Sequence, residues 1–132
     1  MFINKKIAVV GSNGFIGSNL VDYLSKYYHV TAFSSKSLGF KTNQKVKYIN
    51  SKNLNINNIK NLKSLKCDKF IYCVSMNHID TAKDIKNTLN VNIKKFIEFC
   101  EIIKKVNKKN AVIYLSTFQV YGDLTDKKII NE

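Results

Sequence analysis

The sequence contains no arginine, no proline and no tryptophan, and all 22 of its basic residues are lysine. Against 9 acidic residues the lysines give a formal charge of +13, which raises the question of a nucleic-acid or membrane partner. The guanidinium of arginine can form two parallel hydrogen bonds to a phosphate or to a base edge. A surface dedicated to nucleic-acid binding is therefore expected to contain arginine. The lysines are also dispersed along the chain, and we therefore expect no nucleic-acid partner.

Long apolar runs and paired cysteines are missing as well. No run approaches the roughly 20 apolar residues that cross a bilayer, and the first residues lack the pattern of a signal peptide. We therefore expect no membrane partner. The three cysteines, Cys67, Cys73 and Cys100, are an odd number without metal-ligand spacing, and Cys73 and Cys100 fall in apolar patterns that predict buried, reduced side chains. These features predict a cytoplasmic location and no metal site.

The 132 residues, 45% of them hydrophobic, are enough for one folded domain spanning 1–132. Apolar runs predict buried strands at 7–10, 29–33, 69–74 and 111–115, with a short strand at 47–49. Helical spacing of apolar residues occurs at 15–24, 56–65 and 88–105. Regular alternation of strands and helices predicts an α/β fold with a doubly wound parallel sheet and right-handed crossovers.

The first predicted strand runs into a glycine-rich turn at 11–17 (GSNGFIG), and a predicted helix follows at once. This arrangement presents backbone N–H groups and a helix N-terminus to a phosphate. The glycines allow a tight turn, close approach of a pyrophosphate and close packing of helix on strand. With the strand at 29–33 completing a β-α-β unit, the turn predicts a Rossmann-type dinucleotide site, although glycine turns also occur for purely structural reasons. Its predicted cofactor-binding residues are Gly11, Asn13, Gly14, Phe15, Ile16 and Gly17.

Small or polar residues also follow the other predicted strands. In a parallel sheet, ligands bind beyond the carboxyl ends of the strands, so these residues are expected to share one cleft. Ordinary turn chemistry would explain any one of them in isolation. They are Ser34, Ser35 and Lys36 after the second strand, Ser75 after the fourth, and Ser116 and Thr117 after the fifth.

Two motifs resemble those of the extended short-chain dehydrogenase/reductases, the NAD-dependent epimerase/dehydratase family. The turn at 11–17 is similar to the family's cofactor turn, and 115–123 (LSTFQVYGD) is similar to its Ser-Ser/Thr-x-x-Val-Tyr-Gly signature. Weaker similarities lie between them. Asn53-Leu54 resembles the family's Asp-Leu near the adenine, and Asn92 resembles its structural and cofactor-site asparagine. The segment 68–75 resembles the strand Asp-x-Val-x-His-x-Ala-Ala, with Tyr72 in place of the histidine.

The resemblance implies a nucleotide-sugar epimerase, dehydratase or reductase that exchanges a hydride between NAD or NADP and a sugar carbon. It implies further that Thr117 is the catalytic hydroxyl and that a Tyr-x-x-x-Lys tyrosine is the acid/base. A homodimer is the expected assembly, and a nucleotide sugar the expected substrate. By the same resemblance, Asn53, Leu54, Ser75, Asn92 and Ser116 would lie at the cofactor.

The family's Tyr-x-x-x-Lys motif lies downstream of Val-Tyr-Gly, and this sequence ends at Glu132 without reaching it. A literal match at 48–52 (YINSK) falls on the predicted third strand, far too early, and we reject it. The expectation is therefore the cofactor-binding half of a longer enzyme, with a sheet incomplete on its carboxy-terminal side and no activity of its own. The alternatives are a non-catalytic NAD(P)-binding sensor, the product of a decayed gene and, less favoured for the reasons given above, a lysine-rich nucleic-acid binder whose affinity would depend steeply on salt.

The choice of cofactor depends on the end of the second strand. NAD enzymes usually place Asp or Glu there for the ribose 2′-hydroxyl, whereas NADP enzymes supply a cation. This chain has Ser34, Ser35 and Lys36 instead. Two hydroxyls and a lysine could hold a 2′-phosphate, and we expect NADP in preference to NAD.

Overall fold

The computed structural model describes residues 4–35, 44–53, 62–63, 66–76, 82–106 and 111–116. Its strands form a five-stranded sheet in the order β3-β2-β1-β4-β5, with every neighbouring pair parallel. The predicted α/β fold with a parallel sheet is confirmed. The strands are β1 (Lys6–Val10), β2 (His29–Ser34), β3 (Val46–Asn50), β4 (Lys69–Tyr72) and β5 (Ala111–Tyr114).

The central strand β1 lies between β2 and β4, and its last three residues are buried. Ala8 and Val9 have no exposed surface, as expected of a strand that is covered on both faces. Val10, the last residue of β1, is in register with Phe33 on one side and Tyr72 on the other. The carboxyl ends of β1, β2 and β4 therefore lie side by side.

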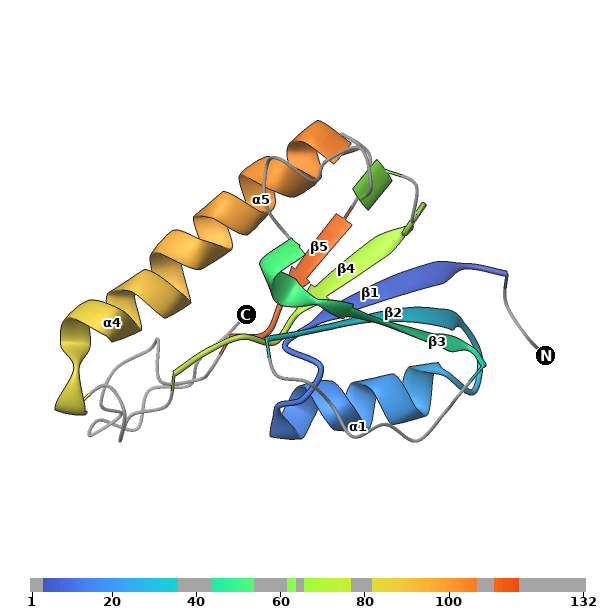
Figure 1. Cartoon of the computed structure of the whole chain (residues 1–132), viewed down its shortest axis with the longest axis horizontal. Helices are drawn as coiled ribbons and strands as arrows, with labels where there is room; N and C mark the ends of the chain where they lie inside the picture. The colour runs from blue at the N-terminus through green and yellow to red at the C-terminus, as the bar shows by residue number, and fades with distance from the viewer. Residues whose placement is uncertain are drawn as a thin grey trace, which may run out of the picture.

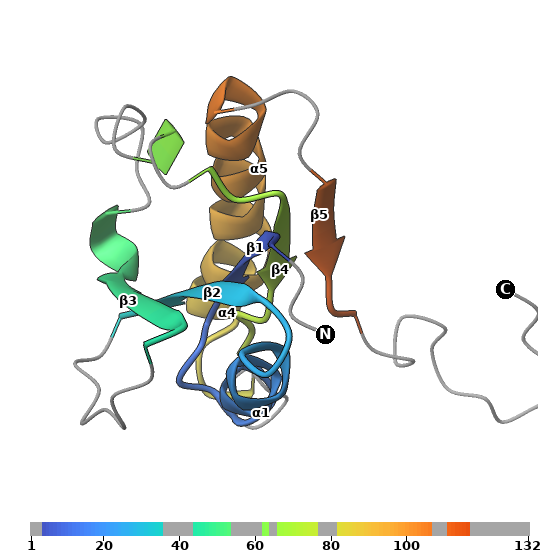
Figure 2. The ribbon, with the colours of Figure 1, turned by 90° about the vertical axis from the view of Figure 1, so that its right-hand side faces the viewer.

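Helices cover both faces of the sheet (Figure 1). Helix α1 (Phe15–Leu24) packs on one face, where Val21 joins Val9, Val30 and Ala32 in a small core. The other face carries one long helical segment made of α4 (Ile85–Leu89), the π-helix η3 (Asn90–Lys94) and α5 (Lys95–Val106). Its larger core includes Phe33, Phe70 and Phe99. Figure 2 shows β3 and β5 at opposite edges of the sheet.

The second helical segment differs from the sequence prediction in one respect. A regular helix is expected at 88–105, but the segment begins at Ile85 and contains the π-helix. The predicted buried side is confirmed: Phe99 and Ile103 are buried, and Phe96 and Cys100 are partly buried. The helix predicted at 56–65 falls largely outside the described residues.

Aromatic rings attach the edge strand β5 to the helix above it. The Tyr114 ring lies 4.4 Å from that of Phe96, and the Tyr72 ring lies 5.0 Å from those of Phe96 and Phe99, all between centroids. On the opposite face of β5, Ile113 is 48% exposed. The edge strand is therefore packed on one face and open on the other. Among the described residues, no helix is long and apolar enough to span a membrane.

Candidate functional site

The glycine turn after β1 is fixed between the ends of β2 and β4. The backbone N–H groups of Gly11 and Ser12 donate to the Phe33 carbonyl oxygen at 2.9 and 3.0 Å. Gly11 has φ +85°, a conformation that favours glycine. A Cβ at this position would also lie 3.1 Å from the Cys73 carbonyl carbon, at the end of β4. Position 11 therefore requires glycine for both conformation and space.

Helix α1 begins directly after the turn, and its N-terminus is open. Gly14 is the N-cap residue, no side chain caps the helix there, and its first turn contains no acidic residue. The first N–H groups of a helix have no intrahelical partner and carry the positive end of the helix dipole. The start of α1 is therefore suited to an anion such as a phosphate.

The surface around this N-terminus is open and partly apolar. Phe15 is 88% exposed and Ile16 is 54% exposed. A Cβ built on Gly14 would meet one atom within 4 Å, the Gly11 carbonyl oxygen at 3.4 Å. Large apolar side chains that are exposed beside an open backbone turn are typical of a surface that a ligand or partner covers.

The last turn glycine has a packing role. A Cβ on Gly17 would overlap the Gly11 carbonyl oxygen and lie 2.9 Å from the Gly11 carbonyl carbon. Both atoms belong to the backbone and cannot move aside. Gly17 therefore sets how closely α1 approaches the turn, whereas the space around Gly14 is open.

The other strand ends lie along the same edge of the sheet as the turn. Cys73 N–H donates to the Val10 carbonyl at 2.9 Å, and Leu115 N–H donates to the Tyr72 carbonyl at 3.3 Å, so the strand pairing extends past β4 into this edge. The predicted site residues at this edge are Gly11 and Asn13 in the turn, Ser34 at the last position of β2 and Ser35 directly after it, Asn53 at the end of the 3-10 helix η1 (Ser51–Asn53), Ser75 after β4 and Ser116 after β5.

The second strand is one residue longer than predicted and ends at Ser34, so of the two adjacent serines only Ser35 follows β2, and the two differ in accessibility. Ser34 is buried and Ser35 is exposed. The residue predicted to stand in the place of the NAD-type carboxylate is Ser34, but the accessible hydroxyl at this strand end belongs to Ser35.

Asn92 holds the chain segment that follows β4. Its Oδ1 accepts a hydrogen bond from Met76 N–H at 2.7 Å, and its Nδ2 donates to the Met76 carbonyl oxygen at 3.2 Å. The Thr88 hydroxyl contacts the Met76 Sδ at 3.9 Å from the preceding helical turn. Asn92 comes from the π-helix, a local irregularity that occurs often at functional sites. Its described contacts give it a positioning role for the segment that follows β4.

Three of the predicted site residues, Lys36, Leu54 and Thr117, lie outside the described residues. The Val-Tyr-Gly signature lies outside them as well. Their predicted roles in binding the 2′-phosphate, the adenine and the reacting oxygen stay predictions.

A sequence model of the NAD dependent epimerase/dehydratase family matches residues 7–132. The chain belongs to this family. Among curated proteins, the bifunctional polymyxin resistance protein ArnA of Wigglesworthia glossinidia brevipalpis is 31% identical over 128 residues. That alignment covers 92% of this chain and 19% of the relative, so the chain spans about a fifth of the relative's length.

Solved structures share the fold at lower identity. The UDP-N-acetylglucosamine 4-epimerase of Methanobrevibacter ruminantium M1, in complex with UDP-N-acetylmuramic acid, aligns with TM-score 0.79 and 22% identity, covering 98% of this chain and 43% of that one. The UDP-Glc/GlcNAc 4-epimerase of Campylobacter jejuni aligns with TM-score 0.79 and 18% identity, covering 93% and 40%. The enzyme WbmF of Bordetella bronchiseptica, in complex with NAD+, aligns with TM-score 0.74 and 17% identity, covering 89% and 38%.

Tyr72, which the sequence resemblance aligns with a histidine of the family, is a core residue. Its ring is buried among aromatic neighbours, and burial, with Tyr114 close by, raises the pKa of Tyr72 to about 12. It therefore remains a neutral phenol at physiological pH. Burial likewise raises the pKa of the Cys67 and Cys73 thiols, which makes them poor nucleophiles. No cluster of metal-ligating side chains occurs among the described residues.

Sequence reasoning missed Ser12 as part of the site. Its hydroxyl donates to the Phe33 carbonyl oxygen at 3.0 Å, in addition to its backbone N–H, and the residue is 4% exposed. Ser12 is thus a positioning residue that ties the turn to β2. The sequence signal for this role was a small polar residue between the glycines. It was not sufficient, because Phe33, the hydrogen-bond partner of Ser12, is 21 residues away in the sequence.

The contrast between Gly17 and Gly14 leads to a stability prediction. We expect Gly17→Ala to lower the free energy of unfolding by about 1–3 kcal/mol, because its Cβ overlaps fixed backbone atoms. Gly14→Ala is the matched control, with φ −74° and open space around it, and should change stability by less than about 1 kcal/mol. Urea unfolding followed by circular dichroism, without cofactor, measures both. Equal stability of the two variants would contradict the packing role of Gly17.

Proposed function

We propose that this chain is the cofactor-binding part of an NAD(P)-dependent nucleotide-sugar epimerase, dehydratase or reductase. The observation that carries the proposal is the glycine turn at the uncapped N-terminus of α1, fixed to β2 by the Phe33 carbonyl. Family membership supports the reaction class. The nucleotide-sugar substrate is suggested by the 4-epimerases that share the fold, and Thr117 remains the proposed catalytic hydroxyl.

The pyrophosphate of the dinucleotide would lie against Gly14 and the first N–H groups of α1. The nicotinamide half would extend along the ends of β4 and β5, past Ser75 and Ser116, and the adenosine half along the ends of β2 and β3. When bound, the cofactor supplies the hydride acceptor and donor. The described residues bind and orient it through backbone N–H groups, and Asn92 keeps the β4 end in place.

A cytoplasmic location belongs to the same proposal. It is supported by Cys67, Cys73 and Cys100, which form no disulfide, because reducing compartments keep cysteines as thiols.

Gly14→Val tests the cofactor site. The valine side chain would occupy the space next to the uncapped helix end, and we expect dinucleotide binding to fall below detection by isothermal titration calorimetry. Circular dichroism of the variant should match the parent, because position 14 is exposed and its backbone conformation is extended. A folded Gly14→Val variant that kept its affinity would overturn the assignment of the turn to the pyrophosphate.

Ser35→Asp tests the preference for NADP. Ser35 is the exposed hydroxyl at the end of β2, and a carboxylate there would repel a 2′-phosphate but accept a bond from a 2′-hydroxyl. We expect the ratio of NADP to NAD affinity to fall by about tenfold or more, since like charges placed together cost several kcal/mol. Ser35→Asn, of similar size but neutral, should leave the ratio unchanged. If both variants have the parental ratio, Ser35 does not contact the ribose.

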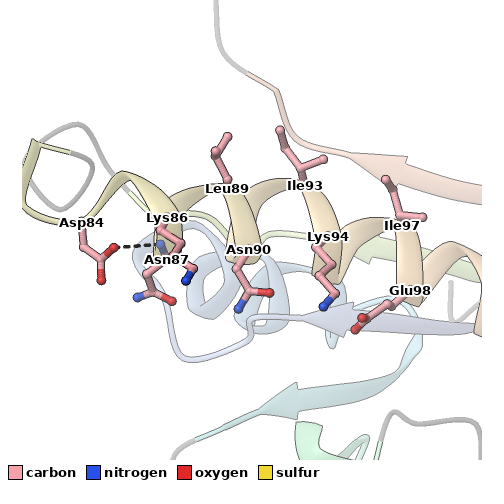
Figure 3. Close-up of a pocket in the computed structure, with 9 residues that line it drawn as sticks. All are labelled: Asp84, Lys86, Asn87, Leu89, Asn90, Ile93, Lys94, Ile97 and Glu98. Atoms are coloured by element: carbon pink, nitrogen blue, oxygen red, sulfur yellow. Dashed lines mark hydrogen bonds between the residues drawn. The ribbon is translucent and has the colours of Figure 1, made fainter.

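The proposed assembly is a homodimer formed through the exposed side of α4, η3 and α5. Ile85, Leu89, Ile93 and Ile97 recur every four residues and are 63%, 53%, 53% and 56% exposed. Figure 3 shows Leu89, Ile93 and Ile97 pointing to the same side of the helix. With Asp84, Asn87 and other residues they line a groove of about 920 Å³. This groove lies on the helix surface and is separate from the cofactor site.

The spacing of these residues is symmetrical about Val91. A second copy packed antiparallel on this side would place Leu89 of each copy against Ile93 of the other, and Ile85 against Ile97. Such a self-complementary patch is what a two-fold interface requires. Burying four large side chains per copy would remove exposed apolar surface that a monomer leaves in water.

Leu89→Glu tests the dimer. A charge at the centre of the patch should convert the protein to a monomer in sedimentation-velocity analysis at micromolar concentration, because an unpaired buried carboxylate is costly. Lys104→Glu, an exposed position on the same helical segment outside the patch, is the control and should remain dimeric. A parent protein that is monomeric at the same concentrations would contradict the proposal directly.

A further inference from the structure

The π-helix η3 interrupts the second helical segment between two rows of side chains that face different sites. An α-helix advances about 100° per residue, so three four-residue steps from Ile85 to Ile97 would carry a row about 120° around the axis. A π-turn encloses one residue more than an α-turn and removes about 100° of that drift. The exposed apolar side chains therefore stay in one outer row, and Figure 3 shows Leu89, Ile93 and Ile97 on the same side.

The same irregularity straightens an inner row, which faces the sheet. Thr88 is 7% exposed, and Asn92 and Phe96 follow at the same spacing of four residues and are partly buried. Asn92 and Ile93 are neighbours within η3, one in the inner row and the other 53% exposed in the outer row. One turn of helix therefore carries both a residue that is bonded to the segment after β4 and a residue of the apolar patch.

Described contacts connect η3 to the glycine turn. The Asn92 amide bonds both backbone groups of Met76, accepting from its N–H at 2.7 Å and donating to its carbonyl oxygen at 3.2 Å. Earlier in the same segment, Cys73 N–H donates to the Val10 carbonyl at 2.9 Å. The Cys73 carbonyl carbon would lie 3.1 Å from a Cβ on Gly11, so it packs directly against the turn. A short stretch of backbone thus runs from the turn to the π-helix.

We propose that the π-helix couples the cofactor site to the dimer interface, so that a bound cofactor strengthens the dimer and the dimer strengthens cofactor binding. This coupling rests on the proposed function, which supplies the cofactor at the turn and a second copy on the outer row. The cofactor would fix the segment after β4 and with it the bonds between Met76 and Asn92. The second copy would fix the outer row, which is straight only in the π form. Both partners then favour one arrangement of the same helical turn, as coupling requires.

The competing arrangement is a continuous α-helix. Regular α-helical bonding is the usual state of such a segment, and π-turns occur mostly as isolated irregularities. α5 is held in the larger core by Phe99 and Ile103, so a return to α-helical bonding would turn the part before η3. Ile85 and Leu89 would rotate by about 100° out of the outer row. Loss of the Asn92 bonds to Met76 would therefore disrupt an interface on the opposite side of the helix.

Asn92→Leu tests this element without any cofactor. Leucine is similar in size, cannot bond to the Met76 backbone and has a higher α-helix propensity than asparagine. We expect the dissociation constant of the dimer, measured by sedimentation equilibrium, to rise at least about tenfold, although Asn92 does not line the groove. Ile103→Val trims a buried side chain of α5 and controls for a general loss of packing. Its dimer constant should stay within about twofold of the parental value.

NADP tests the reciprocal effect. We expect the monomeric variant Leu89→Glu to bind NADP at least about threefold more weakly than the parental dimer in isothermal titration calorimetry, and Lys104→Glu to bind it like the parent. With one cofactor per copy, saturating NADP must then strengthen the parental dimer by the square of that factor, about tenfold. In Asn92→Leu the NADP effect on the dimer should be lost. Gly14→Val should dimerise like the parent, with or without NADP.

The outcomes separate the coupling from the proposed function. A parent that binds NADP but has the same dimer constant with and without it would overturn the coupling and leave the cofactor site intact. An Asn92→Leu variant with the parental dimer constant would also overturn it, because η3 would not be the connecting element. A parent that binds neither NADP nor NAD, or that stays monomeric with saturating NADP, would overturn the proposed function and the coupling together.

Discussion

The carbonyl oxygen of Phe33, at the end of β2, accepts three hydrogen bonds from the glycine turn: two from backbone N–H groups and one from the Ser12 hydroxyl. These bonds fix the position of the glycine turn. The position of the turn then determines where α1 begins. Gly11 can make them because its φ is positive, and Gly17 lets the helix come close enough to complete the arrangement. The uncapped end of α1 therefore faces the carboxyl edge of the sheet as a consequence of one backbone acceptor.

Much of this arrangement is local in sequence, and for that reason it could be predicted. The bounds 15–24 of α1 and the parallel sheet follow from a glycine turn placed between apolar runs. The π-helix could not be predicted, since Asn92 and its partner Met76 are 16 residues apart and the apolar spacing on either side fits an ordinary helix. Ser12 was missed for the same reason. Which of two adjacent serines is exposed after β2 also depends on packing, not on sequence pattern.

The two edges of the sheet differ in chemical character. At the carboxyl edge the glycine turn offers backbone N–H groups, small hydroxyls and the dipole of α1, and Lys52 after β3 is an exposed cation there. At the opposite edge, where the strands begin, the exposed side chains include Lys5, Lys45 and Lys69. Parallel topology produces this segregation because residues before strands and residues after strands are sorted to opposite ends. In the sequence the lysines are only dispersed. The strand order shows which of them lie at the edge where the strands begin.

Phe33 links the turn to the hydrophobic core in a further way. Its side chain has no exposed surface and belongs to the larger core beneath α5, while its carbonyl holds the turn on the side of α1. Phe33 thus has contacts in both layers of the protein, through its side chain in one and its carbonyl oxygen in the other. Linkage makes any such coupling reciprocal: if a change in the packing of Phe33 alters the affinity of a ligand at the turn, that ligand alters the stability of the packing by the same free energy. A bound cofactor would then stabilise the core of the domain. A substitution that weakens the packing around Phe33, even far from the turn, would lower the affinity for the cofactor.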